Sequence, residues 1–200
     1  MRSLLIFFLI STLTLAAISC KKNNENGIEN VIESSKQPQA SIKEKKILTP
    51  EEKDKANSVM YRLVGLPEVK NFTAYTLSLT ENLGQPNQNY IVFAPSNNAM
   101  DNMSSELKVF YSNQENISKL ENLVKSHIVE GELSDENLIQ LIKKNGKARL
   151  KTLAGTTLTA SQIDDVIVLT DEKGGKAKVE RIDMRASNGQ VFIIDSVLSL

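Results

Sequence analysis

The sequence predicts an α+β fold, and three observations support this class. In the first part of the folded region, apolar residues recur at helical spacing. From Ala148 onward they alternate with polar residues, as they do in β-strands. The pair Asn188-Gly189 is the strongest short-range signal for a β-hairpin. Helices followed by a run of hairpins are typical of an α+β domain.

The folded region is predicted to begin at Thr49. Thr49 is the expected N-cap of a first helix, with Pro50 at the first helical position and Glu52 at the capping-box position. The helical pattern then continues until Gly65 stops it. Its apolar members are Ala56, Val59, Met60, Leu63 and Val64.

A second helix is predicted over residues 69–79, and a buried strand follows at residues 90–94. Pro95 cannot donate a hydrogen bond to a sheet, so we expect it to end the strand. Ser96 or Asn97 then caps a short helix. Because a capping role accounts for Ser96 fully, no catalytic role is assigned to it.

Two longer helices are predicted before the strands begin. The first is an amphipathic stretch over residues 117–128, and His127 lies on its apolar face. A histidine in this position is more often a hydrogen-bonded core residue than a metal ligand or a catalytic base. The second helix spans residues 135–143, with Ser134 as its cap.

The last third of the chain reads as strands joined by turns. Ala154-Gly155 is a predicted turn, and the alternation slips between Val179 and Ile182, which indicates a bulge. The strands are predicted over residues 148–153, 156–161, 166–169, 177–186 and 191–198.

The composition argues against several classes of function. Basic and acidic residues are equal in number, at 24 each, so no overall field attracts nucleic acid. One cysteine and one histidine are too few for a zinc cluster or an intramolecular disulfide. No acid, base and nucleophile recur in a catalytic pattern. We therefore expect no catalytic residues, no metal, no cofactor and no nucleic-acid partner, and an enzyme is the least favoured class.

The N-terminus reads as an export signal. Arg2 precedes an apolar run that is short for a membrane span, and small residues stand before Cys20. Small residues directly before a cysteine resemble a bacterial lipobox, which implies that residues 1–19 are a signal peptide and that Cys20 is the lipidated first residue of a bacterial lipoprotein. The alternative is an ordinary signal peptide that is cut elsewhere. The polar composition of residues 20–48 predicts a disordered tether to a domain at residues 49–200.

Four sequence blocks, in order, resemble the signature of fasciclin-like domains. They read YIVFAPSNNAM, LENLVKSHIVEGEL, LKTLAGTTLT and ASNGQVFIIDSVL, and the resemblance covers about residues 55–200. It implies a compact β-sandwich wedge with several packed helices. The residues that it marks as fold-supporting are Pro95, Asn97, His127, Gly155, Asn188, Gly189 and Asp195.

The resemblance also implies a function. Fasciclin-like domains are mostly adhesion or interaction modules, so we expect a non-catalytic binding or adhesion module. The N-terminal signal places this module in the bacterial cell envelope, and Lys21 after Cys20, by resemblance to the sorting rule of enterobacteria, favours an anchor in the outer membrane. Its partner would be a protein or a glycan. The alternative is a periplasm-facing lipoprotein that binds a small ligand or organises other envelope proteins.

The family analogy suggests where a partner would bind, near the block at residues 126–131 and the turn at residues 154–156. Animal members often have a tyrosine before the histidine, tied to receptor binding, whereas this chain has Ser126, so that contact is not carried over. The residues expected at the partner surface are Ser126, Glu130, Glu132 and Thr156.

Overall fold

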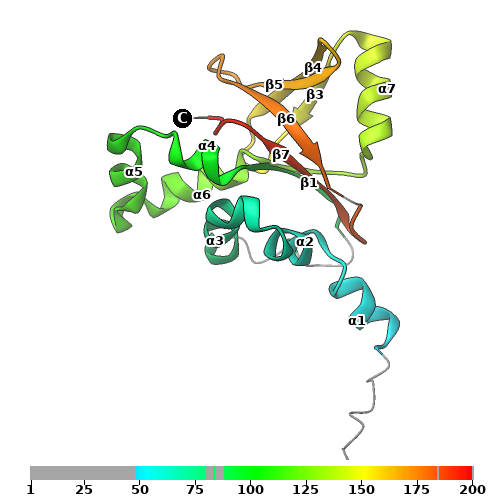
Figure 1. Cartoon of the computed structure of the whole chain (residues 1–200), viewed down its shortest axis with the longest axis horizontal. Coiled ribbons are helices and arrows are strands. Elements are labelled where there is room, and N and C mark those ends of the chain that lie inside the picture. Colours follow the sequence, from blue (N-terminus) through cyan, green and yellow to red (C-terminus); the bar gives the residue numbers. More distant parts are fainter. Residues whose placement is uncertain (1–47, 80–82, 84–87, 184, 200) are drawn as a thin grey trace, which may run out of the picture. The chain divides into compact units, whose positions relative to one another are not determined.

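The computed structural model describes residues 48–79, 83, 88–183 and 185–199 (Figure 1). These residues belong to one compact unit, Lys45–Leu200. The predicted signal peptide, the lipidation site Cys20 and the tether, apart from Leu48, lie outside the described residues.

Helices come first in the chain and strands dominate its second half. The helices are α1 (Pro50–Lys55), α2 (Val59–Gly65), η1 (Pro67–Val69), α3 (Lys70–Leu79), α4 (Asn97–Asp101), α5 (Ser105–Ser112), η2 (Gln114–Asn116), α6 (Ile117–Lys125) and α7 (Asp135–Asn145). The strands are β1 (Tyr90–Pro95), β2 (Ile128–Glu130), β3 (Ala148–Lys151), β4 (Thr157–Ile163), β5 (Val166–Thr170), β6 (Lys176–Ile182) and β7 (Gly189–Ile194).

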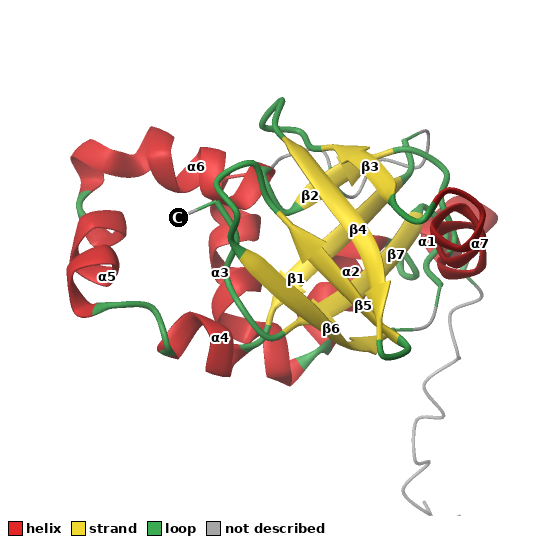
Figure 2. Ribbon diagram, turned by 90° about the horizontal axis from the view of Figure 1, so that it is seen from above, coloured by secondary structure: helices red, strands yellow, loops and turns green. Residues whose placement is uncertain are grey.

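The strands form one seven-stranded sheet in the order β2-β1-β7-β6-β5-β4-β3. All neighbours are antiparallel except β1 and β7, which run parallel. An antiparallel bridge between Val129 and Thr152 joins the two ends of the order, so the sheet is nearly closed (Figure 2). The α+β prediction is confirmed.

A bulge in β6 bends the sheet into two halves. Val179 pairs with Ile194, but Arg181 pairs with Ile193, so Glu180 is an extra residue on β6. The bulge was predicted from the phase slip after Val179, and it lets β6 pair with β5 on one side and β7 on the other. The two halves face each other as a wedge.

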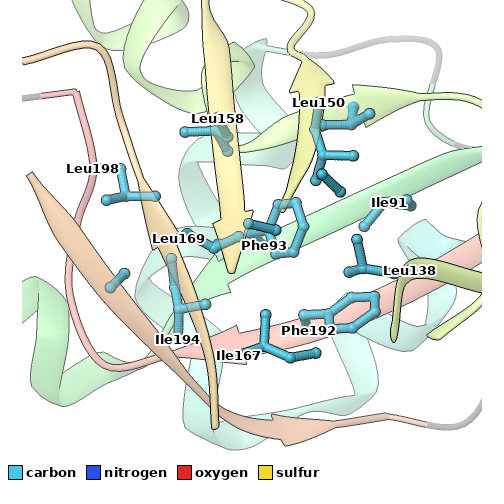
Figure 3. Close-up of a cluster of buried hydrophobic side chains, with 14 of the residues drawn as sticks. Ile91, Phe93, Leu138, Leu150, Leu158, Ile167, Leu169, Phe192, Ile194 and Leu198 are labelled. Carbon is cyan, nitrogen blue, oxygen red and sulfur yellow. The ribbon is translucent and has the colours of Figure 1, made fainter. Parts of the chain in front are cut away.

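The inner faces of the wedge enclose the main apolar core (Figure 3). Phe93 of β1 and Phe192 of β7 lie at its centre, with ring centroids 5.3 Å apart and a tilted geometry. Leu138 of α7 packs against the same cluster. The other residues labelled in Figure 3 are Ile91, Leu150, Leu158, Ile167, Leu169, Ile194 and Leu198.

A second core lies between the outer face of β1 and β7 and the helices. Val92 and Val191 point to this side, where they meet Leu63 of α2, Phe72 of α3 and Val124 of α6. Side chains of a strand alternate between faces, so β1 and β7 supply both cores. This explains why residues 90–94 form an unbroken apolar run, and the predicted burial on both faces is confirmed.

The predicted caps are present, although the first helix is interrupted. Thr49 and Glu52 form the capping box of α1. We predicted one helix to Gly65, but Ser58 starts a new one, because its hydroxyl accepts a hydrogen bond from the Tyr61 N–H and its backbone is extended. Periodicity alone did not reveal this break.

Two further helix predictions need correction. The amphipathic helix over residues 117–128 ends at Lys125, because Ile128 pairs with Val92 in β2. Helix α5, with Ser104 as its cap, was not predicted. The caps predicted at Ser96 and Ser134 are confirmed, since each hydroxyl accepts a hydrogen bond from a backbone N–H three residues on.

Candidate functional site

A groove lies where α5, α6, two β-turns and the C-terminal segment meet, at the end of the domain opposite α7 (Figure 1). Its volume is about 360 Å³. We call it the α6–hairpin groove. Its lining residues are Phe110, Tyr111, Lys119, Asn122, Leu123, Ser126, Ala154, Thr156, Asp171, Glu172, Lys173 and Ser199.

The groove brings together two of the residues expected at the partner surface, Ser126 and Thr156. Thr156 belongs to the turn between β3 and β4, where its carbonyl accepts a hydrogen bond from the Thr152 N–H at 2.8 Å. Ser126 is only 2% exposed and its hydroxyl donates to the Leu123 carbonyl at 2.7 Å. Ser126 therefore forms part of the floor, and its expected role as an exposed contact residue is corrected.

His127 fixes the floor of the groove to the C-terminal segment. Its Nδ1 lies 2.8 Å from the Leu123 carbonyl, and its Nε2 accepts a hydrogen bond from the Leu198 N–H at 3.0 Å. These partners assign the proton to Nδ1. Complete burial lowers the pKa of His127 to about 4, although the bond to Leu123 and the charge of Asp171 act in the opposite direction. The ring is therefore neutral at pH 7, and both of its nitrogens are hydrogen-bonded within the fold.

Asp171 holds two of the segments that border the groove. One carboxylate oxygen accepts hydrogen bonds from the N–H groups of Lys173 and Gly175, at 2.9 and 2.8 Å. The other accepts from the Ser199 N–H at 2.7 Å. A single buried carboxylate therefore shapes the turn between β5 and β6 and fixes the end of the chain.

The accessible lining of the groove is aromatic and polar. Phe110 is 42% exposed and meets Tyr111 in a T-shaped arrangement, with ring centroids 5.2 Å apart. Partial burial raises the pKa of Tyr111 above that of a free tyrosine. Lys119 and Asn122 are exposed on α6. This set offers stacking surface, hydrogen-bond donors and acceptors, which suits noncovalent binding of a polar partner.

Glu130 and Glu132 do not line this groove, so the four-residue surface expected from the sequence is not one surface. Glu130 ends β2 and is paired in register with Tyr90. Glu132 follows β2, and its carboxylate accepts a hydrogen bond from the Asn89 side chain at 2.9 Å. Both residues are exposed; Glu130 directly precedes the Gly131 bend and Glu132 directly follows it.

Asn97 and Pro95 lie where β1 meets the helices. The Asn97 side chain donates to the Pro67 carbonyl at 2.8 Å and accepts from the Asn71 N–H at 3.0 Å. It thereby joins the start of α4 to η1 and α3. Pro95 is buried as the last residue of β1.

Asn188 and Gly189 join the last hairpin to the rest of the fold. The buried Asn188 side chain accepts from the Val59 N–H at 2.7 Å and donates to the Leu83 carbonyl at 3.0 Å. Gly189 has a φ of 140°, and a Cβ there would lie 1.8 Å from the Tyr90 carbonyl oxygen. The glycine therefore allows β7 to pair closely with β1.

The predicted hairpin is present, but its register differs from the expected one. Ala186 pairs with Gly189, so the two loop residues are Ser187 and Asn188 rather than the Asn-Gly pair. Elsewhere Gly155 occupies the β3–β4 turn with a φ of 81°. Asp195 accepts a hydrogen bond from the Lys178 N–H at 2.8 Å and so extends the pairing of β6 with the end of β7.

Neither a metal site nor a membrane span is found in the part of the chain that the structure describes. Within residues 48–79, 83, 88–183 and 185–199, His, Cys, Asp and Glu do not gather in groups that could hold a metal ion. Over the same ranges, each helix is too short or too polar to cross a bilayer.

The aromatic wall of the groove was missed by the sequence analysis. It comes from α5, whose only local signals are the Ser104 cap and the adjacent aromatics Phe110 and Tyr111. For Asp171 there is a local signal, since an Asp ahead of two glycines is typical of a turn. Its second bond, to Ser199, joins residues 28 positions apart and has no local signal.

Comparisons with known proteins agree with this fold. The Fasciclin domain family model matches residues 67–200. Human Stabilin-1 is 31% identical over 127 residues, which is 60% of this chain but 5% of Stabilin-1. The solved structure of a FAS1 domain pair from the insect cell adhesion molecule fasciclin I matches with a TM-score of 0.56 at 16% identity, covering 72% of this chain and 51% of the pair.

Proposed function

Because the chain belongs to the Fasciclin domain family, we propose that it is a non-catalytic binding or adhesion module, anchored by lipid in the bacterial cell envelope. A family of cell adhesion domains supports a role in binding rather than turnover. The chain spans only a small part of Stabilin-1, so the activities of that whole protein are not transferred to it.

The α6–hairpin groove is the observation that carries the proposed binding role. Five segments of the chain converge on it, and two buried groups, His127 and Asp171, hold three of them in place: α6, the β5–β6 turn and the C-terminal segment. A binding site gains affinity when its walls are fixed before the partner arrives, because less ordering is needed on binding. The groove has such a fixed floor and an accessible rim.

The chemistry of the rim favours a polar partner with a planar or ring-shaped group. Phe110 presents an aromatic surface, while Asn122 and Lys119 present hydrogen-bond donors beside it. Glu172 adds a carboxylate, which accepts a hydrogen bond from the Thr157 N–H at 3.0 Å. Aromatic rings next to amides and charges suit a glycan or a peptide loop, and the proposed partner belongs to one of these two classes.

The proposed anchor is a lipid on Cys20, joined to the domain by the tether of residues 20–48. An anchored domain stays near the membrane, which raises its effective concentration toward partners in the envelope. Substitution Cys20→Ala should abolish metabolic labelling with a palmitate analogue and release the protein from the membrane fraction. If the variant were still labelled and retained, the lipoprotein interpretation would be wrong.

Adhesion of beads coated with the full-length lipid-free protein (Cys20→Ala) tests the binding role. Bound beads would be counted on envelope preparations and on whole cells. Phe110→Ala and Lys119→Glu should each reduce binding several-fold, since truncation of an aromatic anchor typically costs more than about 1 kcal/mol. Val109→Ala on the same helix and Lys143→Glu on α7 are matched controls that should bind normally. Equal binding by all four variants would exclude the groove.

A further inference from the structure

A second hollow lies among α3, α4, α5 and α6, and it shares the lining residues Tyr111 and Leu123 with the α6–hairpin groove. We call it the four-helix cavity, and its volume is about 400 Å³. This volume lies at the lower end of the range for ligand pockets, roughly 300–1,000 Å³. Its lining residues are Asn71, Ala74, Tyr75, Met100, Asp101, Met103, Lys108, Tyr111, Ser112, Leu120 and Leu123.

The floor of the cavity is apolar and adaptable. Met100 and Met103 are 8% and 9% exposed, and Leu120 and Leu123 are each 5% exposed. Methionine side chains are unbranched and change shape easily, so they conform to ligands of irregular or flexible form. A floor of two methionines and two leucines therefore fits an unbranched alkyl chain.

Helix α5 covers the cavity without filling it. None of its residues is buried, and its packing neighbours are η2 and α6. Val109 on α5 is 72% exposed, so this apolar side chain does not close the space beneath the helix. A helix that only served to complete the core would bury at least one large side chain.

Polar groups at the wall are available to a ligand. Lys108 is the one cationic side chain among the lining residues, all of which lie in the described part of the chain. Its ammonium donates a hydrogen bond to the neutral Asp101 carbonyl at 2.5 Å. The Asp101 side chain is exposed and also lines the cavity. Exchange of a neutral carbonyl for a carboxylate makes the hydrogen bond of a lysine stronger.

We propose that the four-helix cavity binds a single-chain carboxylate amphiphile of the medium-chain fatty-acid class. The alkyl chain lies against Met100, Met103 and Leu120, and the carboxylate replaces the Asp101 carbonyl as the partner of Lys108. Tyr111 and Leu123 line both this cavity and the groove, so the two spaces adjoin there. This inference does not depend on the proposed adhesion role.

Calorimetric titration of the full-length lipid-free protein (Cys20→Ala) with decanoate, below its micelle concentration, tests the proposal. Decanoate should bind at one site per chain. Lys108→Gln should weaken decanoate binding about tenfold while leaving decanol binding unchanged, because only the carboxylate needs the charge. Lys143→Gln, at an exposed position on α7 that lines neither space, is the matched control and should bind decanoate normally.

A cavity-filling variant separates this site from nonspecific apolar binding. Ala74→Trp should abolish binding of both decanoate and decanol, whereas Leu77→Trp on the same helix, which does not line the cavity, should leave both unchanged. Circular dichroism would establish that both variants are folded. Absence of decanoate binding to the parent protein, or binding that survives Ala74→Trp, would overturn the proposal. If Lys108→Gln bound decanoate as tightly as the parent protein, the assignment of the carboxylate to Lys108 would be wrong.

Discussion

The imidazole of His127 accepts a hydrogen bond at Nε2 from the main-chain N–H of Leu198, 71 residues further along the chain. Through its other nitrogen the same ring contacts the carbonyl of Leu123 on α6. The sole histidine of the protein is thus a link between a helix and the C-terminal segment, and its chain neighbour Ser126 lines the α6–hairpin groove. Both ring nitrogens are used, so the residue has no spare capacity for catalysis or metal binding.

This role predicts a pH-dependent stability. Protonation of His127 is favoured in the unfolded chain, where the pKa is near 6.5, over the folded protein, where it is about 4. The stability that the neutral histidine contributes to the folded protein is therefore fully present above pH 6.5, and it is lost as the pH falls toward 4. The difference between the two pKa values corresponds to about 3 kcal/mol in the free energy of unfolding. Urea unfolding between pH 7 and pH 4 should show this loss.

Carboxylates also titrate in this range, so a variant must isolate the histidine. His127→Gln keeps a donor and an acceptor in the side chain but cannot titrate. It should be less stable than the parent at pH 7, and its stability should fall less between pH 6.5 and pH 4. Parallel stability profiles for the two proteins would show that the histidine does not cause the pH dependence.

Gly189→Ala should be severely destabilising. The added Cβ would lie 1.8 Å from the Tyr90 carbonyl oxygen, so β1 and β7 would have to separate. We expect a loss of at least about 3 kcal/mol in the free energy of unfolding. Gly155→Ala is the matched control, since Gly155 also has a positive φ but no atom within 4 Å of its Cβ position. It should cost about 1 kcal/mol from backbone strain alone, and equal losses in denaturant unfolding would refute the steric account.

Asn188→Ala should cost more stability than Asn97→Ala. The first removes the bonds to the Val59 N–H and the Leu83 carbonyl, and leaves both groups buried. An unsatisfied buried group costs about 1–3 kcal/mol. Asn97 makes two comparable bonds in a more exposed place, where water can replace them. Thermal unfolding of the two variants measures the difference, and the reverse order would contradict this reasoning.

The β4–β5 turn should be open to stabilisation. Asp164 and Asp165 have φ values of 48° and 63°, which define a left-handed two-residue turn that favours Asn-Gly. The double substitution Asp164→Asn and Asp165→Gly should therefore raise the free energy of unfolding by about 1 kcal/mol. Chemical denaturation of the double variant gives the test, and a net loss of stability would count against strain in this turn.

Much of the fold was predictable because its signals are local. The capping box at Thr49, the unbroken apolar run of β1 and the phase slip after Val179 each lie within a few residues, and each was confirmed. The break at Ser58 was missed, because apolar spacing on both sides of it remains helical. The parallel pairing of β1 with β7 joins residues about a hundred positions apart, and no short pattern encodes it.

The candidate site was only partly predictable for a similar reason. The family blocks indicated Ser126 and Thr156, which do line one groove. Neither the aromatic wall supplied by Phe110 nor the link from Asp171 to Ser199 could be read from neighbouring residues. The sequence pattern also does not show which side chains are exposed or which of them share a surface. Ser126 is buried, and Glu130 lies outside the groove.

Site-specific photocrosslinking in producing cells tests the central claim most directly. A photoreactive phenylalanine analogue would replace Lys119 in the groove, and Lys143 on α7 as the matched exposed position. We predict a discrete crosslinked adduct from position 119, lost when excess unmodified protein competes, and none from position 143. An adduct of equal yield from position 143, or none from position 119 on cells that bind the protein, would contradict a binding role for the α6–hairpin groove.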